Sequence, residues 1–224
     1  MNPDNLISTY RKLRSTIPDD VCLVAVSKTK PLSMILELYQ AGQRDFGENK
    51  VQDLVAKAGD LPKDIRWHFI GHLQRNKVKQ IIPFVYLIHS VDSERLLEEI
   101  DKRASDLDEP VDCLLQVHIA EEESKFGLDE AELIELVSKI CAGAYSRVCI
   151  RGLMGMATNT KDEAQVRKEF RRLKQLSDEL KTQFTCPQIQ PDTLSMGMTG
   201  DYKLALEEGS NMLRIGSLLF GERH

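Results

Sequence analysis

Short apolar segments alternate with helical patterns along almost the whole chain, and this alternation constrains the fold more than any other feature of the sequence. The first segment, residues 21–26, is rich in β-branched residues and contains no polar ones, which is typical of a strand buried on both faces. Strands that alternate with helices form right-handed crossover units and a parallel sheet. We expect eight strands, at residues 21–26, 44–46, 67–70, 84–88, 111–119, 148–156, 193–196 and 212–215.

Capping residues indicate where two of the helices begin. Asp129 followed by Glu132 has the spacing of a capping box, and so has Thr160 followed by Glu163. A further helix, residues 3–16, is expected before the first strand. The helix that starts near Thr160 is long, and its buried face is expected at Val166, Phe170, Leu173 and Leu180.

Eight strand–helix units are compatible with a closed barrel or with a large doubly wound sheet. The average unit is 224/8 = 28 residues long, which is compact for a barrel of typically ~250 residues. The doubly wound alternative lacks both its glycine-rich dinucleotide motif and a P-loop motif. No Gly/Ser/Pro-rich linker divides the chain. We therefore expect the α/β class, with residues 1–224 forming a single (β/α)8 TIM barrel and an extra N-terminal helix.

Charge and composition narrow the classes of partner and compartment. The formal charge is 30 − 35 = −5, which argues against a sequence-independent nucleic-acid binder. No apolar run approaches the ~20 residues that span a bilayer, and the N-terminus has no signal-peptide pattern. The five cysteines are odd in number and include no C-x-x-C pair, which predicts reduced thiols. We expect a cytoplasmic protein that contacts neither membrane nor nucleic acid.

Functional residues of a TIM barrel gather where its strands end. Lys28 follows the first expected strand, at the rim of the barrel core. A lysine amine in such a position is a nucleophile that can form a Schiff base with an aldehyde. The alternative is a lysine whose charged end simply reaches solvent at the end of a strand.

The two loops after the last strands offer small residues, hydroxyls and backbone N–H groups. Ser195 precedes two nearby glycines, and Gly216 and Ser217 open a terminal helical stub. These loops are where barrels commonly bind phosphate, although glycines can also serve only to turn the chain. A lysine after the first strand and a phosphate site after the last two would together suit a phosphorylated aldehyde.

Eight motifs in fixed order extend this interpretation to nearly the whole chain. They are AVSKTKP, DFGENKVQ, WHFIGHLQRNK, HSVDS, EESKFG, RGLMGM, LSMGMTGDYKLALEEGS and RIGSLLFG. With these motifs the chain resembles the pyridoxal phosphate homeostasis protein family, the single-domain relatives of the alanine racemase barrel. The resemblance implies a barrel of the alanine racemase type (fold type III) that carries pyridoxal 5′-phosphate.

The resemblance also implies roles for individual residues. Lys28 would hold the cofactor as a Schiff base, Asn49 would approach the ring, and Arg214 would lie near the pyridine nitrogen. Ser195, Gly216 and Ser217 would hold the phosphate.

Four residues depart from the pattern of the family without removing a proposed ligand. Lys50 stands where relatives often carry an aromatic residue, and His72 where many have proline. Phe126 replaces a smaller or polar residue, and Ser217 a threonine. Lys50 and His72 are the two departures expected to alter the mouth of the site.

Two functional classes follow from the resemblance. The first is a protein that binds the cofactor without catalysis and stores it, buffers it or delivers it to apo-enzymes that use it. The second is a pyridoxal-phosphate-dependent amino-acid racemase; a cofactor-free Schiff-base aldolase is a weaker third. A racemase needs two opposed bases, and in two-domain racemases the second comes from elsewhere in the dimer. The chain ends about eight residues after its last expected strand, and an arginine near the ring nitrogen weakens the electron sink. We expect the binding class and a monomer.

The remaining candidates have an ordinary structural alternative. Lys30 and Lys125 are expected on the same rim as Lys28 and could accept the aldehyde during transfer, or they could simply be solvated. His68 and His72 form an H-x-x-x-H pair that spans a glycine turn and lacks an acidic partner, so no metal site is expected. His89 and His118 are expected to be structural, and the basic run 167–174 to be a solvated helix face.

Overall fold

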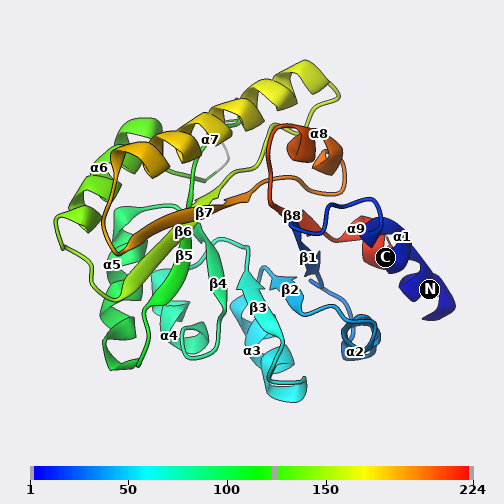
Figure 1. Ribbon diagram of the computed structural model, residues 1–224. Coiled ribbons are helices and arrows are strands. Elements are labelled where there is room, and N and C mark those ends of the chain that lie inside the picture. Colours follow the sequence, from blue (N-terminus) through cyan, green and yellow to red (C-terminus); the bar gives the residue numbers. More distant parts are fainter. Residues whose placement is uncertain (1–2, 123–125, 222–224) are drawn as a thin grey trace.

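Eight parallel strands close into a barrel in which each strand pairs with its neighbours in the sequence and β8 pairs with β1 (Figure 1). The computed structural model describes residues 3–122 and 126–221. The expected (β/α)8 barrel of the alanine racemase type is confirmed. Its strands are β1 (Cys22–Val26), β2 (Asp45–Glu48), β3 (Arg66–Phe69), β4 (Leu87–Val91), β5 (Val111–Gln116), β6 (Val148–Met154), β7 (Ile189–Ser195) and β8 (Met212–Ile215).

Helices surround the barrel, and the expected helix before the first strand is present. This helix, α1, packs beside α2 and α9, so the first and last described helices lie side by side (Figure 1). No helix among residues 3–122 and 126–221 is both long and apolar enough to cross a membrane. The helices are α1 (Pro3–Arg14), α2 (Leu32–Gln40), α3 (Val51–Asp60), α4 (Val78–Ile81), α5 (Glu94–Arg103), α6 (Glu130–Cys141), α7 (Glu163–Gln183), α8 (Tyr202–Glu207) and α9 (Ser217–Phe220), with 3₁₀ turns at η1 (Arg75–Lys77) and η2 (Ala104–Asp106).

Apolar side chains pack in two layers. The larger layer lies between the strands and the helices, where the expected buried face of α7 contributes Val166, Phe170, Leu173 and Leu180. A small second cluster fills part of the barrel interior, and it consists of Val24, Leu87, Leu114, Met154 and Met212. Since alternate residues of a strand share a face, His89 and Arg214 lie on the same side as Leu87 and Met212 and also point inward. The interior is therefore divided into an apolar half and a polar half.

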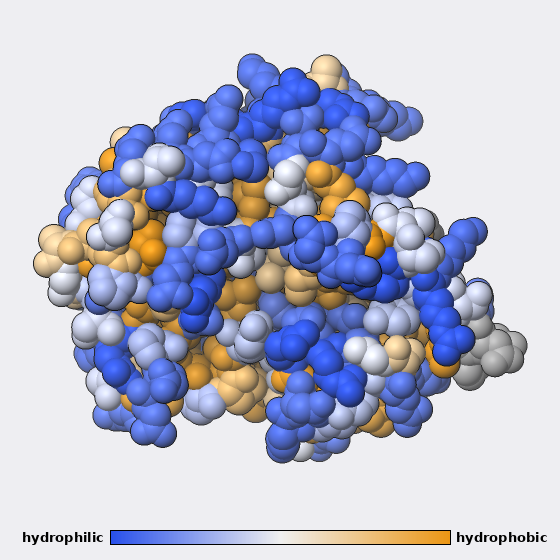
Figure 2. All heavy atoms as spheres, in the orientation of Figure 1, coloured by the Kyte–Doolittle hydropathy of each residue, from blue (hydrophilic) through white to orange (hydrophobic). Residues whose placement is uncertain are grey.

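The basic run of α7 covers its solvated side, as expected. Hydrophilic side chains dominate the outer surface over this helix at the top of Figure 2. Arg167 and Arg171 pair with Glu208, and Arg172 pairs with Glu130. These three arginines of the run are therefore paired within the protein.

One of the two expected capping boxes is confirmed and the other is displaced. At α6, Asp129 Oδ1 accepts from Glu132 N (2.8 Å) and Asp129 N donates to Glu132 Oε2 (2.9 Å). At α7 the N-cap is Asp162, which accepts from the N–H groups of the second and third residues of the helix. The expected capping hydroxyl, Thr160 Oγ1, accepts instead from Asp162 N (3.1 Å), so the helix begins at Glu163.

The expected bounds of several strands were wrong, and one error concerns the site. Strand β4 was expected at residues 84–88 but begins at Leu87, because Phe84 and Val85 donate their N–H groups to Ile81 O and end α4. His89 consequently lies inside the strand instead of in the loop after it. Strand β7 likewise begins at Ile189, four residues before the expected start, and ends at Ser195.

The expectation of five reduced thiols was also wrong. Cys141, at the end of α6, forms a disulfide with Cys186, just before β7. The two residues are 45 positions apart in the sequence, so no local motif predicts that they form a disulfide. Both lie at the amino-terminal end of the barrel, and Cys22, Cys113 and Cys149 remain thiols.

The disulfide should contribute to stability by closing a long loop in the unfolded chain. For a loop of 45 residues the chain-entropy relation gives about 4 kcal/mol, and measured values are typically ~2–4 kcal/mol. We therefore expect Cys186→Ser to lower the free energy of unfolding by this amount in urea titrations without reductant. Thiol counting on the denatured oxidised protein should give three reactive groups. A count of five, or equal stability of the variant and the wild type, would contradict the assignment.

Candidate functional site

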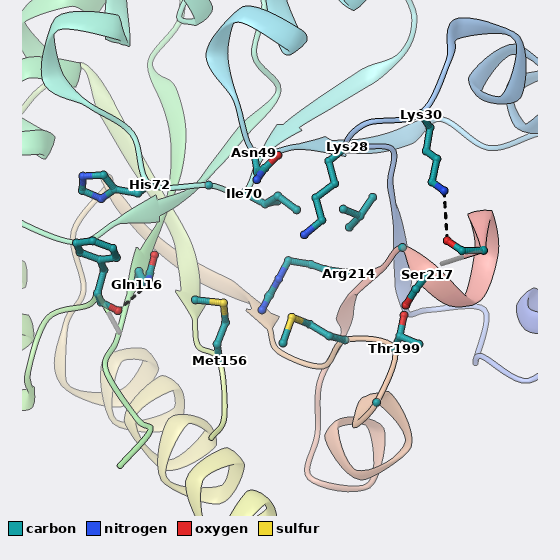
Figure 3. A pocket seen from close by; sticks show the side chains of 17 residues that line it. Lys28, Lys30, Asn49, Ile70, His72, Gln116, Met156, Thr199, Arg214 and Ser217 are labelled. Atoms are coloured by element: carbon teal, nitrogen blue, oxygen red, sulfur yellow. Dashed lines mark hydrogen bonds between the residues drawn. The ribbon is translucent and has the colours of Figure 1, made fainter. Parts of the chain in front are cut away.

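A cavity of about 510 Å³ opens at the carboxyl end of the barrel, where the functional residues of this fold gather. Loops after most of the strands line it, and its walls combine apolar side chains with a few convergent polar groups (Figure 3). This composition is typical of a small-molecule site. The sequence-predicted residues in its wall are Lys28, Asn49, Arg214, Gly216 and Ser217.

The turn after β1 directs Lys28 into the cavity. Lys30 N donates to Ser27 O (3.0 Å) and closes the turn, while Thr29 adopts a left-handed conformation with φ 65°. A residue with a β-branched side chain rarely adopts this conformation, and such local strain is often found at functional sites. The half-buried side chain of Lys28 points toward Arg214 (Figure 3).

A buried ionic cluster anchors this turn from behind. Ser27 Oγ and Lys57 Nζ both donate to Glu48 Oε1, over 2.6 and 2.7 Å, and Lys57 Nζ also donates to Ser27 O (2.9 Å). Burial raises the pKa of Glu48, against the opposing effect of Lys57. The cluster joins the ends of β1 and β2 to α3, and so it fixes the backbone that carries Lys28 and Asn49.

Arg214 lies in the floor of the cavity, where β8 meets the rim. Its side chain is 4% exposed; Nη1 donates to Ser195 O (2.8 Å) and Ser195 Oγ (2.6 Å), and Nη2 donates to Gly155 O (3.0 Å). Burial lowers the pKa of Arg214 to about 10, so the guanidinium stays protonated at neutral pH. Of its five N–H bonds, Nε–H and one Nη2–H have no acceptor within the described part of the chain.

Ser195 is not brought into the cavity with the other predicted residues. Its side chain is completely buried beneath Arg214, and its Oγ is 3.1 Å from His89 Nδ1. The reason is that β7 extends to Ser195, which makes its side chain part of the barrel interior instead of the loop.

Two other residues of the same loop, Thr199 and Gly200, line the cavity instead. Gly200 is one of the two glycines noted in the sequence after Ser195, whereas Thr199 was given no role there. Thr199 Oγ1 accepts from Leu218 N (3.4 Å), which places its hydroxyl beside Ser217 (Figure 3). The glycines on either side of Thr199 were the sequence feature that could have pointed to it as a residue of the site.

Two of the departures from the family pattern meet at the opposite rim. The rings of His72 and Phe126 stack, with centroids 4.4 Å apart and planes 20° apart. His72 Nδ1 also lies 2.8 Å from Asp92 Oδ2, and Gln116 Nε2 donates to Phe126 O (2.7 Å). Phe126 is nevertheless 57% exposed, so the pair forms an aromatic edge of the mouth.

The lysines considered for transfer differ in what can be said of them. Lys30 lines the cavity, but its Nζ donates to Phe220 O (3.1 Å) and Gly221 O (3.2 Å) at the end of α9. Lys125 lies outside the described residues. Lys30 thus ties the C-terminal segment to the rim.

The H-x-x-x-H pair is split between two environments. His68 points into the barrel, where Nδ1 is 2.8 Å from His89 Nε2 and Nε2 is 3.0 Å from Asp45 Oδ1. His72 lies at the rim. Within residues 3–122 and 126–221 no group of three or more His, Cys, Asp or Glu side chains could hold a metal ion.

Comparison with known proteins gives a consistent result along the whole chain. Residues 1–224 match the family described as alanine racemase, N-terminal domain. A pyridoxal phosphate homeostasis protein of Vibrio alginolyticus is 43% identical over 212 residues, which cover 92% of this chain and 88% of the relative. A protein of that name from Homo sapiens is 39% identical and covers 90% of this chain and 76% of its own.

Solved structures show the same relationship. PipY of Synechococcus elongatus PCC7942, solved without PLP, superposes with a TM-score of 0.89 at 39% identity and covers 96% of this chain and 100% of its own. The same protein with PLP bound gives a TM-score of 0.85 at 38% identity, with the same coverage. Alanine racemase from Bartonella henselae shares the fold, with a TM-score of 0.75 at 17% identity, and this chain covers 60% of its length.

The buried histidines should make stability sensitive to acid. Burial lowers the pKa of both His68 and His89, so the folded protein binds fewer protons than the unfolded chain below the usual value of 6.5. Stability therefore rises with pH up to about 6.5 and is lost as the pH falls below it. Between pH 6 and pH 5 we expect a loss of about 1 kcal/mol for each histidine that stays neutral.

Urea unfolding at the two pH values measures this loss. His89→Gln should reduce it by about 1 kcal/mol, because one titrating group is removed. His118→Gln is the control, since His118 is outside the buried cluster. An undiminished loss in His89→Gln would contradict the account.

Proposed function

We propose that this chain, which belongs to the pyridoxal phosphate homeostasis protein family, binds pyridoxal 5′-phosphate as a Schiff base on Lys28 and holds it for the cell without catalysis. The observation that carries the proposal is that Lys28 and Arg214 line the same cavity and lie near each other in it (Figure 3). A lysine amine suits an aldehyde, and the unpartnered N–H bonds of Arg214 suit a ring nitrogen that accepts a hydrogen bond. The family relatives support the choice of ligand.

The residues present fit each part of this ligand. Its phosphate would be held by Thr199, Gly216 and Ser217, which supply two hydroxyls and close backbone approach where β7 and β8 end. A side chain at Gly216 would come within 3.3 Å of Val26 O, so the floor is tight at this point. Asn49 would contact the ring from the β2 loop, and Ser195 would act beneath the site through Arg214.

Bound pyridoxal phosphate supplies an electron-withdrawing ring, whose strength depends on a protonated ring nitrogen. Arg214 keeps its own protons at neutral pH, because burial lowers its pKa only to about 10. It therefore donates a hydrogen bond without transferring a proton, which disfavours the chemistry of a racemase. His72 also lines the cavity, but its ring is engaged with Asp92 and Phe126.

The cellular role that suits such a site is to store or buffer the reactive aldehyde and to deliver it to apo-enzymes. The aldehyde end would be sequestered by Lys28, while the cavity remains open at the rim. We place this monomeric protein in the cytoplasm. The Cys141–Cys186 disulfide lies at the opposite end of the barrel from the cavity, so the redox state of the compartment would affect stability and not the site.

Borohydride reduction tests the covalent attachment. After incubation with pyridoxal phosphate and reduction, the added mass should lie on one peptide that contains Lys28. Lys28→Ala should lose the incorporation, whereas Lys168→Ala, at an exposed position of α7, should retain it. Stoichiometric labelling of another lysine in the wild type would overturn the assignment.

Removal of a hydroxyl tests the phosphate site. A hydrogen bond to a charged group contributes about 1.5–3 kcal/mol, so Ser217→Ala and Thr199→Ala should each weaken pyridoxal phosphate binding by roughly 10- to 150-fold. Pyridoxal, which lacks the phosphate, should bind these variants and the wild type equally weakly. Thr182→Ala, on the exposed side of α7, is the matched control. Equal losses for both ligands would show that these hydroxyls hold another part of the molecule.

Solvent deuterium exchange separates the binding protein from the racemase. The loaded protein, incubated in D₂O with each common amino acid, should show no deuterium at Cα by NMR. The physical reason is the weak electron sink above Arg214. Inversion at Cα with deuterium incorporation, at rates near the typical enzyme value of ~10 per second, would make the protein a racemase.

A further inference from the structure

A chain of buried polar side chains crosses the barrel interior below the cavity. It runs from Arg214 Nη1 to Ser195 Oγ (2.6 Å), from Ser195 Oγ to His89 Nδ1 (3.1 Å) and from His89 Nε2 to His68 Nδ1 (2.8 Å). It ends where His68 Nε2 meets Asp45 Oδ1 (3.0 Å). Ser195, His89 and His68 are all 0% exposed, so water does not interrupt the chain.

The Asp45 end of this series of hydrogen bonds determines the position of every proton in it. The carboxylate can only accept, so neutral His68 carries its proton on Nε2 and leaves Nδ1 as an acceptor. Neutral His89 then donates from Nε2 to His68 Nδ1, which leaves His89 Nδ1 to accept from Ser195 Oγ. Ser195 Oγ in turn accepts from Arg214, which can only donate.

An ion pair with Arg66 fixes Asp45, the last residue of this series of hydrogen bonds. Arg66 Nε and Nη2 donate to Asp45 Oδ1 (2.7 Å) and Oδ2 (2.6 Å), and Arg66 and His68 together hold the pKa of Asp45 down to about 2. Asp45 is therefore charged at neutral pH. Every hydrogen bond points from the guanidinium of Arg214 to this carboxylate, and a reversed histidine tautomer would leave two donors or two acceptors facing each other.

We propose that Ser195, His89, His68 and Asp45 are positioning residues for the ligand, which fix the plane of the Arg214 guanidinium and turn its unpartnered N–H bonds toward the cavity. Side chains that only filled the core would not need a fixed set of proton positions, and they would not need a charged carboxylate at one end. The consequence concerns one ligand atom, namely the ring nitrogen that accepts from Arg214. The identity of that ligand rests on the proposed function.

Histidine tautomers in the ligand-free protein test the proton order. Nitrogen-15 NMR at pH 7 should show both His68 and His89 as neutral rings protonated on Nε2. Protonation of His89 on Nδ1 would overturn the chain as drawn, whatever the protein binds.

Binding measurements test the positioning role. In Ser195→Ala the affinity for pyridoxal phosphate should fall about 10-fold or more, because Arg214 loses the Ser195 Oγ acceptor that links it to His89 and fixes its plane. The benzene analogue, in which carbon replaces the ring nitrogen, should bind this variant and the wild type equally. Asp45→Asn keeps the acceptor and the shape while removing the charge, and it should give a smaller loss in the same direction.

Ser90→Ala is the matched control. Ser90 lies next to His89, is 1% exposed and has no hydrogen-bond partner for its Oγ among the described residues, so its loss should not change either affinity. If the wild type binds pyridoxal phosphate and Ser195→Ala binds it equally well, the positioning role is wrong and the proposed function stands. Absence of pyridoxal phosphate binding by the folded wild type would instead remove the proposed function.

Discussion

The buried positive charge of Arg214 is the constraint around which the barrel interior is organised. A guanidinium taken out of water costs several kcal/mol unless its donors are satisfied. Ser195 and Gly155 satisfy three N–H bonds, and Asp45 supplies a negative charge on the far side of two histidines. The polar half of the barrel interior therefore stabilises the buried charge of Arg214, while the apolar half contributes ordinary packing. Arg214 also lines the cavity, so the same network holds one wall of the site.

The floor of the site is held by buried hydrogen bonds, whereas its mouth is formed by side chains on loops. Arg214 below and the Ser27–Glu48–Lys57 cluster behind hold the floor and the Lys28 turn through buried hydrogen bonds between strands. The rim instead consists of side chains on loops, such as the stacked His72 and Phe126.

The fold could be predicted from the sequence because the alternation of apolar and helical segments persists through all eight units. Lys28 could be located for a related reason, since the carboxyl ends of parallel strands meet at one face. Arg214 was expected at the site only because of the family resemblance. Strand bounds were less predictable. Phe84 and Val85 look like part of a strand, but their N–H groups end α4, and the resulting shift moved His89 from a loop into the core.

Other features depend on contacts between segments that are far apart in the sequence. The bond between Cys141 and Cys186 and the contact of His68 with His89 have no local signature. Ser195 and Thr199 illustrate the same limit at the site: Ser195, the last residue of β7, is buried in the barrel interior, whereas Thr199, four residues later, lines the cavity.

A crystal structure of the protein grown with pyridoxal phosphate would test the central claim most directly. The account predicts electron density continuous with Lys28 Nζ, the ring nitrogen within hydrogen-bond distance of Arg214, and the phosphate beside Thr199 and Ser217. Pyridoxal phosphate bound in another cavity, or bound here with its phosphate against Arg214 and no link to Lys28, would contradict it.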